Sequence, residues 1–129
     1  MTVSSFDIDV FFAGYAEALA SRDAKRVTPF WGVPALVLSD QGVIPVAKIE
    51  EIEGFFATAS QNAEYEGVAT TSATVKSALP LADRIIGCEV LWEHQDAAGK
   101  PTGAEAGYYV LRRDDGGSLR IQVYVPKPQ

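Results

Sequence analysis

Few side chains in this sequence could transfer a proton at neutral pH. His94 is the single histidine, and imidazole is the side chain whose protonation normally changes near neutrality. Asp40 is a carboxylate that could orient the imidazole of a general base. Tyr15 carries a phenolic hydroxyl that could donate a hydrogen bond to an oxygen atom of a ligand. The candidate catalytic residues are therefore His94, Tyr15 and Asp40, and they suggest proton transfer without a cofactor.

Each of these residues also has a structural interpretation. Tyr15 lies on an apolar helical stripe, where it could be a core aromatic residue with its hydroxyl satisfied at the rim. His94 comes near the end of a predicted strand, where a histidine is often only half-exposed. Cys88 is expected to be a small buried hydrophobe, because no second histidine or helix N-terminus is evident to activate its thiol.

Aromatic side chains could form the walls of a ligand-binding pocket around these candidate catalytic residues. Trp31 stands between Pro29 and Pro34, where it could line the mouth of a pocket or close the end of a sheet. Tyr108 could supply a second hydroxyl, with a core position as the alternative. The candidate ligand-binding residues are Tyr15, Trp31, Phe56, Trp92, His94 and Tyr108.

Composition and charge exclude several classes of protein. A chain of 129 residues with 47% hydrophobic and 22% charged residues is typical of one globular domain, which we take as residues 1–129. No apolar run approaches the roughly 18 residues of a membrane span. The first residues do not resemble a secretory signal. The net charge of −6 disfavours a nucleic-acid partner, because phosphates would be repelled. These features are typical of a cytoplasmic protein, although they are also compatible with export.

Cofactor and metal motifs are not evident in the sequence. One cysteine and one histidine cannot form a multi-cysteine cluster or a histidine-pair metal site. No glycine-rich phosphate loop follows a predicted strand and opens a helix. We therefore expect no metal and no cofactor.

Three helices are predicted in the first half of the chain. The first starts near Ser4 or Ser5, which can cap it, and its apolar stripe consists of Ile8, Phe12, Tyr15 and Leu19. A short second helix is expected at about Asp23 to Thr28. A third is expected at about Lys48 to Asn62, with a buried stripe of Ile49, Ile52, Phe56 and Ala59.

The remaining elements are predicted as strands. A short hairpin pairs residues 35–38 with 43–46, and Pro45 places its second strand at a sheet edge. Four longer strands are expected at Val68–Leu79, Arg84–Gln95, Gly103–Arg113 and Leu119–Val125. Because the connections between them are short, neighbouring strands should pair antiparallel as a meander.

Loop lengths also predict a pairing register for this meander. In that register Trp92 lies opposite Ala104, Cys88 opposite Tyr108, and Tyr108 opposite Val123. The resulting apolar face comprises Ile86, Cys88, Val90, Trp92, His94, Ala106, Tyr108, Val110, Ile121, Val123 and Val125. The other face carries Glu89, Glu93, Glu105, Arg113, Arg120 and Gln122. Leu91, Tyr109, Leu111 and Tyr124 would lie among these charges, which suggests a homodimer through the outer sheet face.

The order of elements predicts an α+β fold, in which the apolar face of the antiparallel sheet packs on the helices. Particular residues resemble the nuclear-transport-factor-2-like superfamily, which has a cystatin-like fold, and its SnoaL-like bacterial proteins. The resemblance covers about Phe6 to Val125, and it is carried by the spacing of Phe12, Tyr15, Leu19 and Asp23, by Phe30-Trp31-x-x-Pro34, by Glu50 to Phe56 and by the meander that ends at Ile121. The resemblance implies a curved sheet that wraps around about three helices into a cone, with a pocket between sheet and helices. It also implies frequent dimerisation through the outer sheet face.

The resemblance also implies possible activities, because the superfamily includes isomerases, cyclases, dehydratases and epoxide hydrolases, as well as members that only bind or interact. Around Tyr15 the chain is similar to ketosteroid isomerases, in which a tyrosine of the first helix donates to a developing enolate oxygen. The general base of those enzymes would correspond to a position near Leu38 or Ser39. Asp40, the carboxylate nearby, follows that position by one or two residues. Their second acid would fall near Tyr108 to Val110, where there is no carboxylate, so we do not assign that activity.

Two classes of function remain open. The first is a domain that binds a small apolar organic molecule and carries out isomerisation, cyclisation or dehydration, with hydroxyls of Tyr15 and Tyr108 as donors and His94 moving the proton. The second is a non-catalytic binding or protein-interaction module with the same pocket. Fold alone cannot choose between them.

Overall fold

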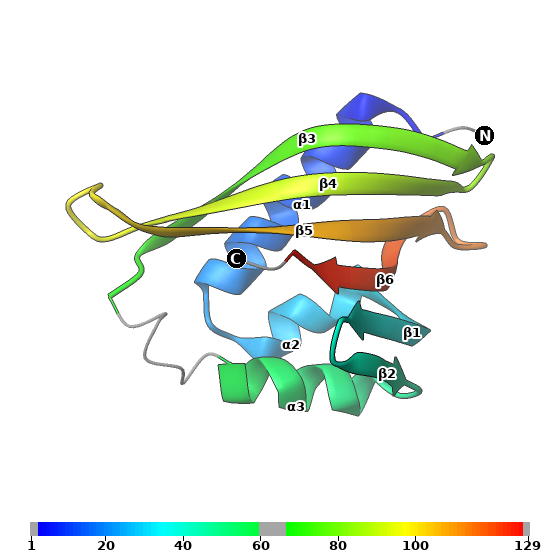
Figure 1. The fold of residues 1–129 in the computed structure, drawn as a ribbon, viewed down its shortest axis with the longest axis horizontal. Coiled ribbons are helices and arrows are strands. Elements are labelled where there is room, and N and C mark those ends of the chain that lie inside the picture. Colours follow the sequence, from blue (N-terminus) through cyan, green and yellow to red (C-terminus); the bar gives the residue numbers. More distant parts are fainter. Residues whose placement is uncertain (1–2, 60–66, 128–129) are drawn as a thin grey trace.

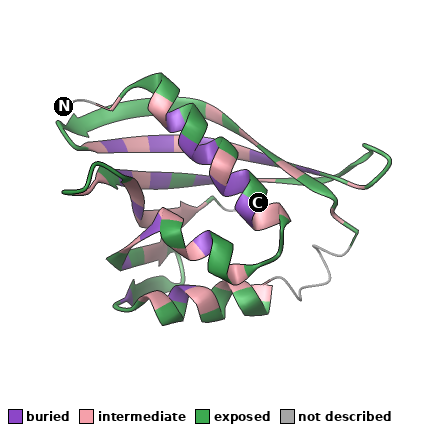
Figure 2. Ribbon diagram, turned by 180° about the vertical axis from the view of Figure 1, so that it is seen from behind, coloured by how far each residue is buried: buried purple, intermediate pink, exposed green. Residues whose placement is uncertain are grey.

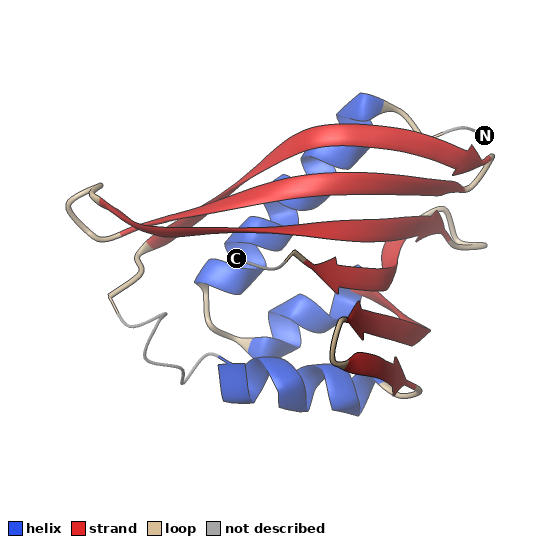
Figure 3. Cartoon of the chain, in the orientation of Figure 1, coloured by secondary structure: helices blue, strands red, loops and turns tan. Residues whose placement is uncertain are grey.

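A single curved sheet with helices on one side organises the chain (Figures 1 and 3). The computed structural model describes residues 3–59 and 67–127. The helical elements are α1 (Ser5–Ala20), α2 (Ala24–Val27), the 3₁₀ helix η1 (Thr28–Phe30) and α3 (Ile49–Ala59). The strands are β1 (Trp31–Ser39), β2 (Gly42–Val46), β3 (Thr70–Ala82), β4 (Ile85–Gln95), β5 (Pro101–Arg113) and β6 (Leu119–Pro126). The predicted α+β architecture is therefore confirmed.

The helices begin where the sequence supplies caps. Ser4 caps α1 with its hydroxyl, which accepts from the backbone N–H of Asp7 at 3.1 Å. Asp23 caps α2 by accepting from the N–H of Lys25 at 3.0 Å. The described part of α3 ends at Ala59, so the predicted continuation through residues 60–62 lies outside the described residues. No helix in the described part of the chain is long and apolar enough to cross a membrane.

The six strands are ordered β2-β1-β6-β5-β4-β3. Pro45 lies in β2, which is an edge strand as predicted. The short hairpin β1–β2 joins the meander through a parallel pairing of β1 with β6, whereas the other neighbours are antiparallel. Viewed from behind, α1 crosses in front of the sheet, and α2 and α3 lie together below it (Figure 2). The inner face of the sheet is therefore the one that α1 covers.

The pairing of β4 with β5 differs from the predicted register. Trp92 pairs with Glu105 instead of Ala104. Beside the loop the strands keep the predicted register, since Gln95 pairs with Pro101, but the ladder shifts by one residue at the next pair. A β-bulge of this kind places two residues of one strand opposite one residue of its partner. Because side chains alternate between faces, the shift turns every later β5 side chain to the face opposite the predicted one.

The hairpin between β5 and β6 is also shifted. Arg113 was predicted opposite Ser118, but it pairs with Leu119. Ser118 instead accepts a 2.8 Å hydrogen bond from the backbone N–H of Asp114. Gly117 has φ +88°, the left-handed conformation that closes a three-residue hairpin loop with a bulge. The predicted two- or four-residue loop was therefore wrong, because the second of the two adjacent glycines takes the left-handed position.

These shifts change which side chains are buried. Tyr109 and Leu111 face inward and are 5% and 0% exposed, whereas Tyr108 is 43% exposed on the outer face. A second shift in the ladder lies between Val110 and Leu111, and it brings Tyr124 opposite Tyr109. The strand β4 keeps its predicted inner residues, and the fully or nearly fully buried ones are Ile86, Cys88, Val90, Trp92 and His94. The predicted outward position of Tyr109, Leu111 and Tyr124 was therefore wrong.

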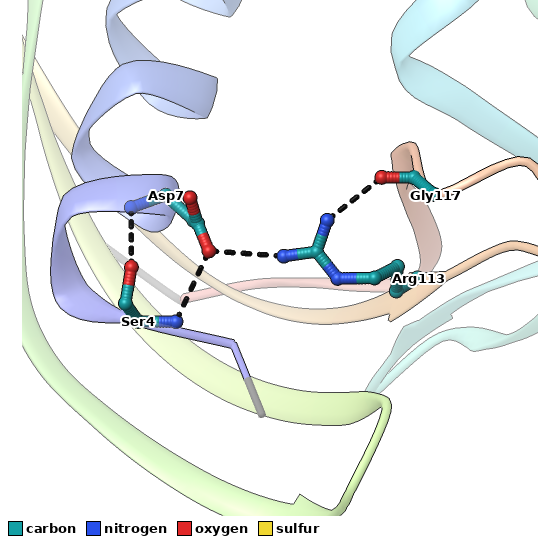
Figure 4. A network of polar contacts seen from close by, with 4 residues as sticks. All are labelled: Ser4, Asp7, Arg113 and Gly117. Atoms are coloured by element: carbon teal, nitrogen blue, oxygen red, sulfur yellow. Dashed lines mark hydrogen bonds and ion pairs between the residues drawn. The ribbon is translucent and has the colours of Figure 1, made fainter. Parts of the chain in front are cut away.

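One polar network ties the start of α1 to the far end of the sheet (Figure 4). The Asp7 carboxylate accepts from the Ser4 backbone N–H at 3.3 Å and from Nη2 of Arg113 at 3.0 Å. Arg113 also donates to the carbonyl oxygen of Gly117 at 2.7 Å. The hydrogen bonds to Ser4, and then the charge of Arg113, lower the pKa of Asp7.

This network predicts a pH dependence of stability. The pKa of Asp7 is lower in the folded protein than its unfolded value of about 3.9. The ionised carboxylate of Asp7 therefore stabilises the fold at pH values above the unfolded pKa. The contribution is lost as the pH falls through the folded pKa, so we expect the melting temperature to drop below about pH 4. Asp7→Asn should flatten this acid limb and lower the melting temperature at pH 7. Thermal melts by circular dichroism between pH 7 and pH 2.5 measure both effects. The exposed Asp9 provides the control, since an equal flattening in Asp9→Asn would contradict the role of Asp7.

Candidate functional site

A cavity of about 430 Å³ lies between the inner face of the sheet and the helices. Its walls come from α1 and α2 on one side, β1, β2 and α3 on another, and β3 to β6 on the third. The aromatic side chains that line it are Tyr15, Trp31, Phe55, Phe56, Trp92, Tyr109 and Tyr124. This size is within the usual range for pockets that hold small organic molecules.

Two tryptophan–tyrosine pairs organise the aromatic wall. The indole Nε1–H of Trp31 donates to the Tyr15 hydroxyl oxygen at 3.0 Å, and the indole of Trp92 donates to Tyr109 at 3.1 Å. The ring centroids of Tyr15 and Trp92 are 5.8 Å apart, so the two pairs are in contact. Each phenol oxygen accepts from an indole, which leaves its own hydroxyl hydrogen for another acceptor. The Tyr109 hydroxyl also shares a side-chain hydrogen bond with Tyr124. Such chains polarise the terminal hydroxyl and make it a better donor.

The phenols of this wall stay protonated at neutral pH. Burial raises the pKa of Tyr15 and of Tyr109 far above the ordinary value for tyrosine. Burial, and then the negative charge of Glu105, raises the pKa of Tyr124 to about 12. The tyrosines can therefore donate hydrogen bonds to a ligand, but they cannot act as bases.

His94 lies between a hydroxyl and a carboxylate on three adjacent strands. Its Nδ1 is 3.0 Å from the Thr71 hydroxyl of β3, and its Nε2 is 3.3 Å from a carboxylate oxygen of Glu105 on β5. His94 is 9% exposed, and all three side chains line the cavity. The geometry fits an Nε2–H that donates to Glu105, while Nδ1 and the Thr71 hydroxyl share a hydrogen bond. A carboxylate that orients an imidazole in this way is a common part of proton-transfer sites.

The cavity contains most of the residues proposed from the sequence. Tyr15, Trp31, Phe56, Trp92 and His94 line it. Tyr108 does not, because the register shift turns it outward. Asp40 lies exposed in the turn between β1 and β2, away from the residues that line the cavity. The predicted inward position of Tyr108 was therefore wrong, whereas Asp40 lies in a turn as expected but is not brought to His94.

Residues missed by the sequence analysis take the places of those two. Glu105 orients His94 where Asp40 was expected, and Tyr109 replaces Tyr108. Both are consequences of the same one-residue shift in β5, since Glu105 was predicted on the outer face. The Gly116-Gly117 pair was a signal for the correct loop, and hence for Leu111 and Tyr109 on the inner face. Nothing comparable marked the bulge beside Pro101.

Cys88 takes no part in this arrangement as a nucleophile. It is 3% exposed on the inner face, and burial raises the pKa of its thiol to about 11. The thiol is therefore protonated at neutral pH, in agreement with the expected role as a small hydrophobe.

The fold and the cavity define the class of this protein as a cone-shaped α+β domain with an internal pocket. Residues 5–129 match the family described as NTF2-like protein (DUF6841), and the chain belongs to this family. No functionally curated protein matches the sequence significantly.

Solved structures with the same fold are distant in sequence. An NTF-2 like protein of unknown function from Shewanella oneidensis is 13% identical, with a TM-score of 0.73 and coverage of 96% of this chain and 98% of that one. A domain of unknown function with a cystatin-like fold from Nostoc punctiforme has a TM-score of 0.75 at 14% identity, with coverage of 98% and 80%. A ketosteroid isomerase-like protein from Erwinia carotovora has a TM-score of 0.67 at 16% identity, with coverage of 94% and 95%. At these identities the likeness shows the fold alone.

Proposed function

We propose that this protein binds a small, mostly apolar organic molecule in the cavity between the sheet and the helices. The observation that carries the proposal is the cavity itself, which combines an aromatic wall with a few convergent polar groups. Tyr15 provides a neutral hydroxyl donor at this wall, and the hydrogen-bonded pair of Tyr109 and Tyr124 provides a second. Apolar walls with a small number of placed polar groups are the usual composition of ligand sites.

A thermal-shift screen against steroid-like, polyketide-like and terpenoid compounds tests this proposal. A ligand that binds only the native state at a hundredfold excess over its Kd stabilises it by about 2.7 kcal/mol. We expect such a stabilisation, and we expect Phe56→Ala to lose it because Phe56 lines the cavity. Phe6 is 73% exposed on α1, so Phe6→Ala should keep the full shift. Equal loss of the shift in both variants would contradict binding in the cavity.

The same site supports proton transfer on the bound molecule. Tyr15 and the hydrogen-bonded pair of Tyr109 and Tyr124 would stabilise a developing negative charge on a ligand oxygen. His94, oriented by Glu105, would move the proton. One observation favours the alternative of a passive binder, since both ring nitrogens of His94 already have partners in Thr71 and Glu105. Exchange of solvent deuterium into a bound ligand distinguishes the two: His94→Gln should abolish exchange and leave binding intact if His94 is the base. Absence of exchange with a tightly bound ligand favours the non-catalytic module.

We also infer that a second copy of this chain is a partner, through the outer face of the sheet. The residues that support this differ from those predicted. Tyr108 is exposed there, and the outer positions of β4 to β6 also carry Leu91, Ala106, Val110, Val123 and Val125. A partly exposed apolar surface on a sheet face is typical of a self-complementary interface. A cytoplasmic location stays a prediction from the composition.

A further inference from the structure

We propose that the cavity selects an organic cation, a molecule with an apolar body and a protonated amine, and that Glu105 is the residue that determines this specificity. This inference rests on the proposed ligand-binding function and goes beyond it by naming the charge of the ligand. Three features of the cavity favour a cationic ligand: its charged groups, its aromatic rings and its hydrogen-bond donors.

The charged side chains that line the cavity are mainly acidic. Asp23, Glu51 and Glu105 contribute carboxylates, and Arg22 contributes the one cation among the charged lining residues that the structure describes. His94 is the further titratable group, and its Nε2 faces Glu105. The guanidinium of Arg22 is directed to the backbone carbonyl of Val68 at 3.5 Å. A carboxylate on a ligand would therefore meet more repulsion than attraction, whereas an ammonium group would meet the reverse.

Glu105 is the carboxylate placed deepest among these groups. Its side chain is 37% exposed, whereas Asp23 and Glu51 are exposed residues. Burial is the main reason why the pKa values of Tyr109 and Tyr124 are raised, and the charge of Glu105 adds to both shifts. The same negative charge that disfavours a phenolate would stabilise a ligand cation that lies against this wall.

The aromatic wall favours a cation for a second reason. The faces of indole and phenol rings carry a negative quadrupole, which attracts ammonium groups, most strongly in sites shielded from water. Trp31, Trp92 and Tyr15 are each less than 5% exposed and line the cavity. A cation bound in the cavity would therefore lie beside three buried aromatic rings.

The hydrogen-bond donors of the aromatic wall do not offset the negative charge of the carboxylates and of the ring faces. The two indole N–H groups are bound to the oxygens of Tyr15 and Tyr109. An anionic ligand would therefore depend on phenol hydroxyls that lie in the field of Glu105. The whole chain has a net charge of −6, which also favours the approach of cations.

A matched ligand series tests the inference on the whole chain by isothermal titration calorimetry. The probes are 2-naphthylmethylammonium, 2-naphthylmethanol and 2-naphthoate, which share one apolar body and differ in charge. We expect the ammonium compound to bind about ten-fold tighter than the alcohol, and the carboxylate to bind most weakly. Added salt should weaken binding of the ammonium compound and leave that of the alcohol unchanged.

Variants then assign the specificity to Glu105. Glu105→Gln should reduce the affinity for the ammonium compound to that for the alcohol, with the alcohol unaffected. Glu93 lies exposed on the opposite face of the same hairpin, so Glu93→Gln is the control and should preserve the ten-fold preference. If Glu105→Gln is unstable in a thermal melt, Glu51→Gln replaces it and should weaken only the ammonium compound.

The outcomes separate this inference from the function on which it rests. Equal affinity for the ammonium compound and the alcohol, or tighter binding of the carboxylate, would overturn the cation preference and leave ligand binding intact. A preference that survives in a folded Glu105→Gln variant would overturn the assignment to Glu105. Where Glu105→Gln does not fold, a preference that survives in Glu51→Gln would overturn the assignment to the cavity carboxylates. Binding of none of the three compounds would overturn the inference together with the proposed function.

Discussion

Replacing Tyr109 with alanine is expected to lower the free energy of unfolding by about 3–5 kcal/mol, whereas the same change at Tyr108 should cost less than about 1 kcal/mol. The two residues are adjacent in β5, but they lie on opposite faces of the sheet. Tyr109 packs against the rings of Phe12, Trp92 and Tyr124. Its removal would leave a void in the core and deprive the Trp92 indole of its acceptor.

Urea denaturation of the two variants and of the wild type measures this difference. A loss of 3–5 kcal/mol is a large part of the total stability of a typical domain, so Tyr109→Ala is expected to be partly unfolded at 37 °C. Sedimentation velocity adds a second comparison, because Tyr108 lies on the face proposed for dimerisation. Tyr108→Ala should weaken self-association while leaving the stability of the monomer almost unchanged. If Tyr108→Ala proves the more destabilising change under monomeric conditions, the observed register of β5 is wrong.

Adding a single methyl group at Gly107 is expected to destabilise the fold by about 1–3 kcal/mol. A Cβ atom at this position would lie 2.7 Å from Cε1 of Tyr124 and 3.4 Å from the carbonyl oxygen of Val125. Tyr124 cannot yield easily, since its ring is stacked on Tyr109 with centroids 4.8 Å apart. The absence of a side chain at Gly107 therefore allows Tyr124 to line the cavity.

Gly103 provides a matched control in the same strand. Like Gly107, Gly103 lies at a position of β5 on the inner face of the sheet. A Cβ atom at Gly103, however, would have no other atom within 4 Å. Gly103→Ala should therefore be neutral or stabilise by up to about 1 kcal/mol, because alanine has less backbone freedom to lose. Chemical denaturation of both variants tests the contrast. Equal effects of the two substitutions would show that close packing of Tyr124 does not require Gly107.

The class and order of the elements were predictable from local patterns. The stripe of α1, which includes Ile8, Phe12 and Tyr15, has the helical period and is buried as expected. The inner residues of β4, among them Trp92 and His94, follow the period of two without interruption. Such patterns indicate which face of an element is buried, and each can be read from its own segment without knowledge of the other elements. They were sufficient for the fold and for five of the six proposed cavity residues.

The register of β5 against its neighbours was decided by the tertiary structure. A bulge near Pro101 and a left-handed Gly117 each shift the pairing by one residue. In consequence Tyr109 and Glu105 face the cavity, and Tyr108 faces outward. Strand β5 is ambiguous by itself, because Tyr108-Tyr109-Val110-Leu111 offers an apolar side chain on either face. Alternation can fix a face only where the two sets of residues differ in polarity.

The sequence by itself determined the fold class, the helices and the residues of α1 and β4 that line the cavity, because local periodicity encodes which face of each element is buried. Only the tertiary structure determined that Glu105 orients His94 and that Tyr109 completes the aromatic wall. Those contacts join neighbouring strands, so they depend on the pairing register. A single inserted residue changes that register without changing the local pattern of either strand.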